Sequence, residues 1–385
     1  MTNRKFATLL GTLTLAAAGH AQVPDLLTAF DAGNAASGAG GAFNGLAADP
    51  SAAYFNPAGL GYAQGRNLLL SRRAVPGSRS RIGGTFNDLT RETRSQFDSE
   101  EFTQIGYSLP MSSLRRGAAG TIGLSYYVGG NIDDIGTVLG NFVLPVANGL
   151  NVTNFREEKH ARTEFYTLAY GRTVGAGNLS YGFGLTYARQ RTSLVQTGNI
   201  VDGTGQPVGG ILTLPNIKAE GGGVGLIGGV QYTPPRNPDT SFGASIRTPI
   251  TVGSNSLYEV VPGRVLLNAA QRLPGLRRGR PDYAVLGVES QTFFGGKRAR
   301  YFDRKVQTTL GVGLEYSFSS GSARVPLRLG YQRIPSGGNG FGDSDAFTYG
   351  IGYRPGSRDF SIDANFLRPE GGGTGISLTA TYRFR

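Results

Sequence analysis

The closing stretch ISLTATYRFR (residues 376–385) decides the fold class. Its apolar side chains alternate with serine, threonine and arginine, so that Ile376, Leu378, Ala380, Tyr382 and Phe384 fall on one face of an extended chain. Since successive side chains of a β-strand point to opposite faces, the stretch predicts a strand with one apolar and one polar face. Segments of this kind, repeated many times, are the sequence signature of a transmembrane β-barrel.

The same alternation continues back through the chain to residue 63. It predicts fourteen strands, near 66–73, 101–109, 120–128, 161–172, 178–190, 219–232, 240–249, 262–272, 282–293, 306–318, 324–333, 345–354, 358–367 and 376–385. The connections alternate between longer and shorter ones, as they do between the extracellular loops and periplasmic turns of outer-membrane barrels. We therefore expect an all-β, 14-stranded antiparallel transmembrane barrel over residues 63–385, with its C-terminus in the periplasm. Residues 78–86 are left open as an additional strand.

Aromatic residues distinguish this prediction from a soluble β-sandwich, whose strands also alternate. They lie at predicted strand ends, as the interface girdles of a membrane barrel do: Tyr107, Tyr126, Tyr170, Tyr187, Tyr232, Tyr331 and Phe384. We therefore favour the membrane barrel.

The composition excludes most enzyme classes. The 385 residues contain no Cys and two His, His20 and His160, so disulfides, thiolate metal sites and Cys nucleophiles are absent, and we expect neither a metal nor a cofactor. His160 lies beside Glu157 and Glu158, as in a barrel hydrolase, but no serine elbow accompanies it. The net charge of +12 comes from scattered arginines, which favours an anionic lipid or ligand over nucleic acid.

Two segments precede the barrel. Residues 1–21 combine Arg4 and Lys5 with an apolar stretch and small residues near position 21, which predicts a signal peptide cleaved before Gln22. Residues 22–62 lack strand alternation and are too apolar for a solvated tail, so we expect them to form a plug, or hatch, of short helices inside the lumen. In this segment Asp49 and Asn56 are predicted helix caps, each followed by proline (Pro50 and Pro57) at the first helical position.

The stretches SGAGGAF (residues 37–43) and DPSAAYFNPAGL (residues 49–60) resemble the N-terminal signature of the FadL-type outer-membrane transport family. Secretion-associated barrels of the PorV type carry a similar signature. SIRTPI (residues 245–250) resembles a strand end of the same proteins. The resemblance implies a fourteen-stranded barrel, a lumenal hatch containing Asn56, Pro57 and Ala58, and uptake of long-chain fatty acids or other hydrophobic molecules that leave sideways into the membrane. The terminal Phe384-Arg385 departs from the aromatic last residue usual in such barrels.

Two predicted outer loops, 129–160 and 191–218, keep apolar residues that a solvated loop would lack. The candidates for a hydrophobic ligand groove are Phe142, Leu144, Ile211, Leu212 and Leu214. The same residues could instead pack the loops over each other and close the top of the barrel.

Inward-facing charges and glycines complete the set of candidate site residues. Glu315, Arg328 and Asp363, with Arg324 and Arg383, are predicted to face the lumen, as a structural network with the hatch or as a carboxylate site. The glycines of GVGLIG (residues 223–228) match a dinucleotide fingerprint in letters, but they lie inside a strand pattern and no helix follows. We expect them to leave space for the hatch or a ligand.

These observations predict passive transport of hydrophobic molecules, foremost long-chain fatty acids, across the outer membrane by a protein that is not an enzyme. The expected partners are the ligand, outer-membrane lipid and the barrel assembly machinery, and not nucleic acid. The alternative is a PorV-like interaction protein, a secretion shuttle or cell-envelope anchor, whose apolar loops bind protein. A barrel hydrolase fits least well.

Overall fold

A computed structural model describes most of the chain after residue 33. The described residues are 23–24, 34–74, 78–82, 88–94, 102–114, 119–139, 142–144, 150–202, 204, 206–214, 216–253, 260–276, 280–296, 306–335, 341–342, 344–357, 359–370 and 374–384. The predicted signal peptide, residues 1–21, lies outside them.

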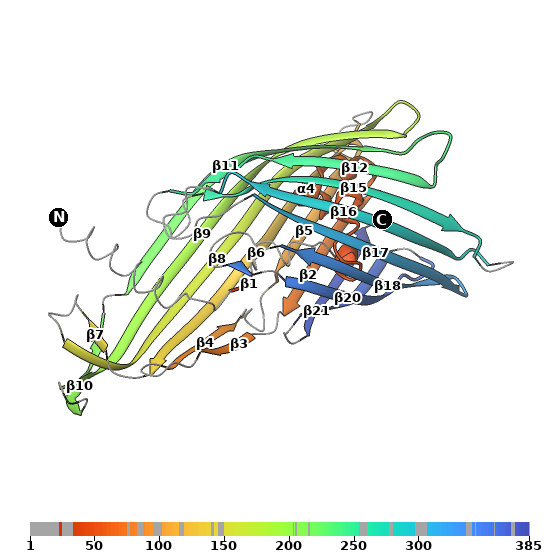
Figure 1. The fold of residues 1–385 in the computed structure, drawn as a ribbon. Helices are drawn as coiled ribbons and strands as arrows, with labels where there is room; N and C mark the ends of the chain where they lie inside the picture. Colours follow the sequence, from red (N-terminus) through yellow and green to blue (C-terminus); the bar gives the residue numbers. More distant parts are fainter. Residues whose placement is uncertain are drawn as a thin grey trace.

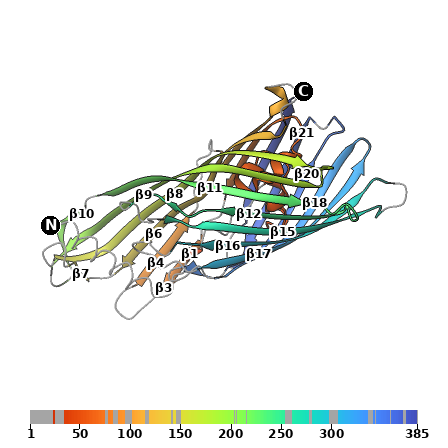
Figure 2. The ribbon, with the colours of Figure 1, turned by 90° about the horizontal axis from the view of Figure 1, so that it is seen from above.

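Fourteen antiparallel strands form the barrel wall (Figures 1 and 2). In chain order they are β2 (Arg66–Ala74), β5 (Gln104–Pro110), β6 (Thr121–Leu139), β8 (Leu150–Val174), β9 (Leu179–Val201), β11 (Ile217–Tyr232), β12 (Thr240–Arg247), β15 (Gly263–Pro274), β16 (Tyr283–Phe294), β17 (Gln307–Ser320), β18 (Ala323–Ile334), β20 (Ser344–Tyr353), β21 (Phe360–Pro369) and β22 (Gly375–Phe384). The last strand, β22, pairs with the first, β2, from Arg66↔Phe384 to Ala74↔Ile376, and closes the wall. The predicted fold class and the location of all fourteen strands are confirmed.

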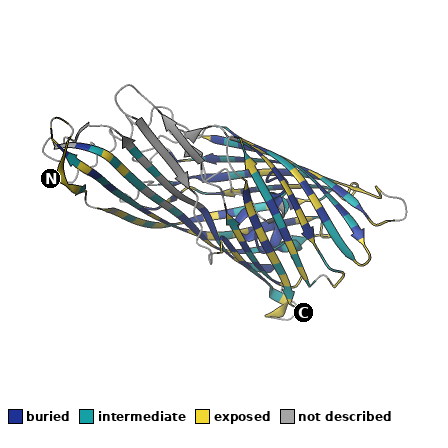
Figure 3. Ribbon diagram, turned by 90° about the horizontal axis from the view of Figure 1, so that it is seen from below, coloured by how far each residue is buried: buried dark blue, intermediate teal, exposed yellow. Residues whose placement is uncertain are grey.

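The apolar and polar faces of the strands are oriented as predicted. In β22, Leu378 is 54% exposed on the outside, whereas Thr379 on the lumenal face is 2% exposed. Figure 3 shows the same alternation of exposed and buried residues along neighbouring strands. Tyr126, Tyr166 and Tyr187 pair in one row across β6, β8 and β9 on the outer face, which fits the expected aromatic girdle.

The prediction that 129–160 and 191–218 are loops is wrong for most of their length. Strands β8 and β9 have 25 and 23 residues and continue far past the predicted strand ends. At about 3.3 Å per residue, β8 spans roughly 80 Å, which is more than the roughly 25 Å apolar band of a membrane barrel. The short strands β7 (Phe142–Leu144) and β10 (Pro207–Thr213) pair with the far ends of β8 and β9 in a four-stranded tip sheet.

An additional strand is also present where the sequence left one open. Strand β3 (Ser78–Ile82) pairs with β4 (Asp88–Arg94), and β4 pairs with the distal part of β6. Strand β1 (Val23–Pro24) pairs in parallel with β19 (Phe341–Gly342).

Residues 34–62 lie inside the barrel, and we call them the inner segment. It contains α3 (Asn34–Ser37), η1 (Asn44–Leu46), α4 (Ala52–Phe55) and η2 (Pro57–Tyr62), drawn in orange within the ribbon of Figure 1. None of the described helices is long and apolar enough to cross a membrane.

Glycine lets the inner segment lie directly against the barrel wall. Gly40 has a positive φ of 64°, which costs little only for glycine. A Cβ atom on Gly311 or Gly330 of the wall would overlap the backbone of Gly40 or its neighbour Ala39. The small residues of this segment therefore act by permitting backbone contact.

Candidate functional site

A buried glutamate joins the inner segment to the wall. The Glu289 carboxylate on β16 accepts hydrogen bonds from Asn44 Nδ2 (2.9 Å) and Gly45 N (3.0 Å) of the inner segment. On the wall side, Gln291 Nε2 (2.8 Å) and Asn268 Nδ2 (3.2 Å) donate to the same carboxylate. Because four donors converge on one buried carboxylate, Glu289 holds η1 at a defined position against the lumenal wall.

The predicted cap at Asn56 is present. Its Oδ1 accepts a hydrogen bond from Ala58 N (3.2 Å) at the start of η2, where Pro57 takes the first position. Its Nδ2 donates to Gly45 O (2.8 Å) inside the segment and to Val230 O (3.1 Å) on β11. Asn56 therefore caps a helix and fastens the segment to the wall with one side chain.

The predicted cap at Asp49 is different in detail. The residue that precedes α4 is Ser51, which makes no side-chain cap bond. Asp49 Oδ1 instead accepts from Ser51 N (2.8 Å) and Ser51 Oγ (2.5 Å), which forms a turn before the helix. Pro50 lies in that turn, two residues before the first residue of α4. Burial of the Asp49 carboxyl raises its pKa, although these hydrogen bonds act in the opposite direction.

Four aromatic rings form a buried cluster around α4; we call it the aromatic cluster. Tyr54 and Phe55 come from α4, and Tyr127 and Phe165 from β6 and β8. The Tyr54 ring stacks on Tyr127 at 4.4 Å between centroids and lies 5.3 Å from Phe165. The cluster therefore joins the inner segment to two wall strands.

Two buried arginines lie over these rings. Arg247 lies with Cζ 4.6 Å from the centroid of Phe165, and Arg264 with Cζ 4.7 Å from that of Tyr54, both within cation–π distance. Arg264 also donates to Tyr54 O (2.7 Å), so it holds the end of α4. The two side chains are 2% and 1% exposed.

Arg247 lacks a carboxylate partner among the described residues. Nη1 donates to Tyr54 Oη (3.0 Å), Nη2 donates to Pro262 O (3.2 Å), and Nε has no hydrogen-bond partner. A buried guanidinium without a counter-charge is costly and is well suited to bind an anion.

A folded-in loop covers this cluster from the side of the long connections. Its strands β13 (Ile250–Thr251) and β14 (Val260–Val261) pair with each other, and Ile250, Val252 and Val261 join the aromatic cluster. The loop fits because β11 presents glycine to it: a Cβ on Gly223 would overlap Thr251 O, and one on Gly225 would press against Ile250. The sequence predicts that these glycines leave space for the hatch or a ligand; Gly223 and Gly225 instead leave space for this loop. We call residues 248–252 and 260–262 the lid.

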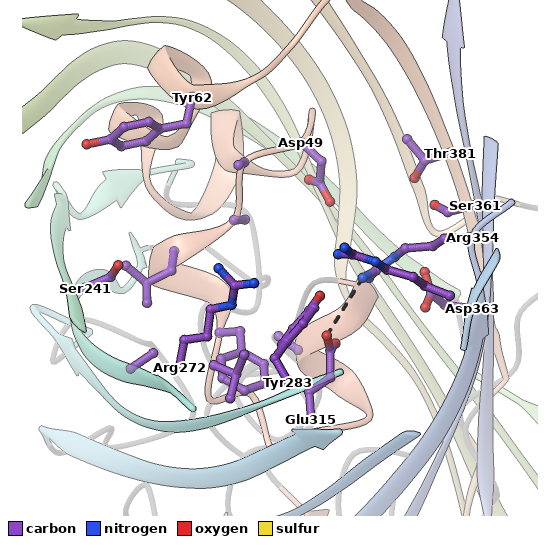
Figure 4. A pocket seen from close by; sticks show the side chains of 18 of the residues that line it. Asp49, Tyr62, Ser241, Arg272, Tyr283, Glu315, Arg354, Ser361, Asp363 and Thr381 are labelled. Atoms are coloured by element: carbon purple, nitrogen blue, oxygen red, sulfur yellow. Dashed lines mark ion pairs between the residues drawn. The ribbon is translucent and has the colours of Figure 1, made fainter. Parts of the chain in front are cut away.

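On the other side of the inner segment is a chamber of about 960 Å³ at the end of the barrel where the connections are short. Its wall includes Phe43, Leu46 and Asp49 of the inner segment, with Val285 and Tyr283 of β16. Figure 4 shows Arg272 of β15 and Arg354, which directly follows β20, reaching into the chamber. Its lining is therefore both apolar and charged.

Of the charged residues predicted to face the lumen, Glu315 and Asp363 both contact Arg328 there. Arg328 donates from Nε to Glu315 Oε2 (2.8 Å) and from Nη1 to Asp363 Oδ1 (2.6 Å), and Arg354 Nη1 lies 3.8 Å from Glu315 Oε1. Glu315, Arg328 and Asp363 come from β17, β18 and β21, so this network links three strands of the wall. Arg324 and Arg383 line the chamber.

The predicted groove residues lie in the tip sheet. Leu214 is buried against Val152, with Leu212 packed on the same cluster, whereas Ile211 is 71% exposed. Phe142 and Leu144 pair through the backbone with Val152 and Leu150; their side chains lie outside the described residues. The tip sheet thus brings these five candidate positions together.

Sequence reasoning missed Glu289, Arg264 and the role of Arg247. Each occupies an inward position of an alternating strand, which is the only signal that could have identified it. Within the described ranges, no three His, Asp or Glu residues are grouped so that they could hold a metal ion.

Solved structures of known proteins resemble this one in fold. They include a Pseudomonas aeruginosa FadL homologue (15% identity, TM-score 0.59, 92% of this chain and 98% of that one), the Ralstonia pickettii toluene transporter TbuX (15%, 0.56, 92% and 98%) and the CymD monoaromatic hydrocarbon channel (13%, 0.58, 94% and 99%). No protein-family model matches the chain, and no curated protein matches it by sequence. The chain therefore has the fold of the FadL homologues and the FadL-like hydrocarbon transporters.

Proposed function

We propose that the protein is an outer-membrane transporter through which hydrophobic molecules bearing a carboxylate, foremost long-chain fatty acids, diffuse passively. The fold shared with FadL homologues and hydrocarbon channels supports transport of hydrophobic molecules. The single observation that favours a carboxylate over a neutral hydrocarbon is Arg247, which is buried beside aromatic rings, with Nε unpartnered and no carboxylate of the described residues in contact with it. A fatty acid supplies both the anion and the chain that such a site accepts.

The route begins at the tip sheet. Leu212 and Leu214 offer an apolar surface, and Ile211 is exposed beside it. Burying one such side chain against an acyl chain is worth about 1.5–3 kcal/mol. Changing both Ile211 and Leu212 to Asp is therefore expected to weaken fatty-acid binding at least tenfold, and unchanged affinity of a folded double variant argues against this entry point.

The lid and the inner segment then act as two gates. The lid separates Arg247 from the long connections, and the inner segment separates Arg247 from the chamber. In the proposed cycle the lid lifts, the carboxylate binds at Arg247, and displacement of the inner segment opens the way to the chamber. The concentration gradient provides the driving force.

Uptake by proteoliposomes tests the proposal. Vesicles containing the protein are expected to take up radiolabelled oleate much faster than protein-free vesicles, and Arg247→Gln is expected to reduce the rate at least tenfold at low oleate concentration. Arg333→Gln, which removes an exposed charge from β18, serves as the matched control and is expected to leave uptake unchanged. Equal stimulation of oleate and toluene uptake, insensitive to Arg247→Gln, would refute carboxylate selectivity.

The tip sheet also supports the alternative of a protein-binding barrel. Val208 and Ile211 of β10 are 64% and 71% exposed, which is unusual for a short edge strand in water. Removal of residues 207–213 distinguishes the two functions. A transporter is expected to retain oleate uptake at high substrate concentration, whereas a protein receptor loses its partner and shows no uptake before or after the deletion.

A further inference from the structure

Positive charge is concentrated at one end of the barrel. The connections at the short end, with the final residue, contain nine arginines and three aspartates: Arg115, Arg116, Arg236, Arg277, Arg278, Arg280, Arg354, Arg358 and Arg385 against Asp239, Asp282 and Asp359. At the opposite end the acidic and basic residues of the long connections nearly balance. The connections at this end therefore carry a net charge of +6, half of the net charge of +12.

Two further arginines line the chamber itself. Arg272 of β15 and Arg324 of β18 both lie over the Tyr283 ring, with Cζ 4.6 Å and 5.5 Å from its centroid. Neither makes an ion pair within the part of the chain that the structure describes, unlike Arg354, which lies 3.8 Å from Glu315. Stacking on one ring keeps the guanidinium groups together at the cavity wall and leaves their N–H groups available.

The remaining wall accommodates a hydrocarbon chain. Phe43, Leu46 and Ala47 line the chamber from the inner segment, and Val285 and Ala270 line it from β16 and β15. A volume of about 960 Å³ is within the range of small-molecule binding sites. Five carboxylates of the described residues also line this space. Arg328 binds Glu315 and Asp363. Asp49 accepts hydrogen bonds from Ser51, and Asp239 and Asp359 belong to connections at the short end.

We propose that the chamber is a second binding site, in which Arg272 and Arg324 hold the anionic head of an amphiphile whose chain lies along Phe43, Leu46 and Val285. This inference rests on the proposed function and adds a receiving site beyond the inner segment. A molecule that passes Arg247 is then captured again before it leaves the barrel, and the basic rim disfavours its return by attracting the anion.

The absence of tryptophan from the chain makes a site-specific test possible. Leu46→Trp places a single fluorophore in the chamber, and Phe165→Trp places one beside Arg247. Each purified variant, in a neutral detergent, is titrated with dibromostearate, whose bromine atoms quench tryptophan on contact, and with its methyl ester, which lacks the charge.

Dibromostearate is expected to quench Leu46→Trp, and the methyl ester is expected not to do so at the same concentrations. Adding Arg272→Gln and Arg324→Gln is expected to raise the half-quenching concentration at least tenfold, while Arg272→Lys with Arg324→Lys retains part of the affinity. Arg236→Gln is the matched control, because it removes an arginine from the same rim outside the chamber lining. It is expected to leave quenching unchanged.

Equal quenching by the ester overturns the proposal, because the chamber would then bind only the apolar chain. Equal weakening by Arg236→Gln also overturns it, because the affinity would then depend on the overall positive charge and not on Arg272 and Arg324. Quenching by brominated phosphatidylglycerol but not by dibromostearate would assign the chamber to a membrane lipid and also overturn it. The Phe165→Trp variant separates the two proposals. Quenching of Phe165→Trp but not of Leu46→Trp refutes only the chamber site. If neither variant is quenched and no oleate is taken up, the proposed function is refuted.

Discussion

Two buried arginines in the same lumen have opposite surroundings. Arg328 binds two carboxylates, Glu315 and Asp363, and all three residues belong to the barrel wall. Arg247 binds a tyrosine hydroxyl of the inner segment and a carbonyl of the lid, and among the described residues it has no carboxylate partner. One nitrogen of each guanidinium is unpartnered, so the decisive difference between them is the counter-charge.

This difference assigns a structural role to Arg328 and a binding role to Arg247. An arginine whose counter-charges lie on other wall strands has a structural role, because removing one partner would leave a buried charge uncompensated. Arg247, by contrast, contacts both the lid and the inner segment, which can move apart. A bound anion would supply its counter-charge.

Removing residues 22–62 is expected to change the surroundings of Arg247 and to leave the Arg328 network intact. The deletion takes away Tyr54 but none of the residues bound to Arg328, so the barrel is expected to assemble and to lose its obstruction. Conductance in planar bilayers and permeability to small polar solutes are expected to rise severalfold or more. Conductance equal to that of the intact protein would show that the segment does not block the lumen.

Arg328→Gln is expected to act on stability. It leaves Glu315 and Asp363 buried without their counter-charge, which costs about 3–5 kcal/mol in buried pairs. Urea unfolding followed by gel mobility is expected to shift to clearly lower denaturant. The triple change Arg328→Leu, Glu315→Leu and Asp363→Leu is expected to recover much of the loss, because no charge is then stranded.

Arg247→Gln is expected to act on binding with little effect on unfolding. No carboxylate is stranded by this change, whereas a charge-assisted hydrogen bond to the ligand is lost, so oleate affinity is expected to fall at least tenfold, or about 1.4 kcal/mol. Equilibrium titration of the Phe165→Trp reporter measures it. A large loss of stability with unchanged affinity would place Arg247 in the same class as Arg328.

Asn56→Ala tests the junction between the inner segment and the barrel wall without removing a charge. Loss of the cap and of the bond to Val230 costs about 0.5–2 kcal/mol. This is small for a closed barrel, but 1.4 kcal/mol changes the ratio of seated to displaced segment tenfold. Solute leak is expected to rise while heat resistance on gels is retained; an unfolded barrel, or leak equal to the unmodified protein, contradicts a role in seating.

Asp49 is expected to give the smallest effect, a pH dependence of the same junction. Burial raises its pKa, so the seated segment holds this proton more tightly than a displaced, hydrated one. Seating is therefore favoured at acidic pH and weakens as the pH rises from the ordinary carboxyl pKa through the raised one. Leak is expected to increase modestly over that range, and Asp49→Asn, which keeps an acceptor for Ser51, is expected to remove the dependence.

The barrel can be predicted from the amino-acid sequence, because strands between lipid and lumen must alternate apolar and polar residues. The stretch at 376–385 and the other thirteen predicted strands show this alternation, and Asn56-Pro57 is a local signal for a helix start. Beyond the membrane the outer face of a strand no longer needs apolar residues, and the apolar alternation ends, as in the charged run Arg156 to Lys159. The sequence therefore does not distinguish the long ends of β8 and β9 from loops.

Only the tertiary structure decided where the inward residues meet. Arg247, Arg328 and Glu289 are alike in sequence, each a charged residue at a lumenal position of a strand. Closing the barrel places carboxylates beside Arg328, four donors around Glu289, and a lid with aromatic rings around Arg247. Alternation fixes which face a side chain occupies, but its neighbours across the lumen come from strands far away in the chain. The counter-charge that separates a structural arginine from a binding one is therefore a property of the closed barrel.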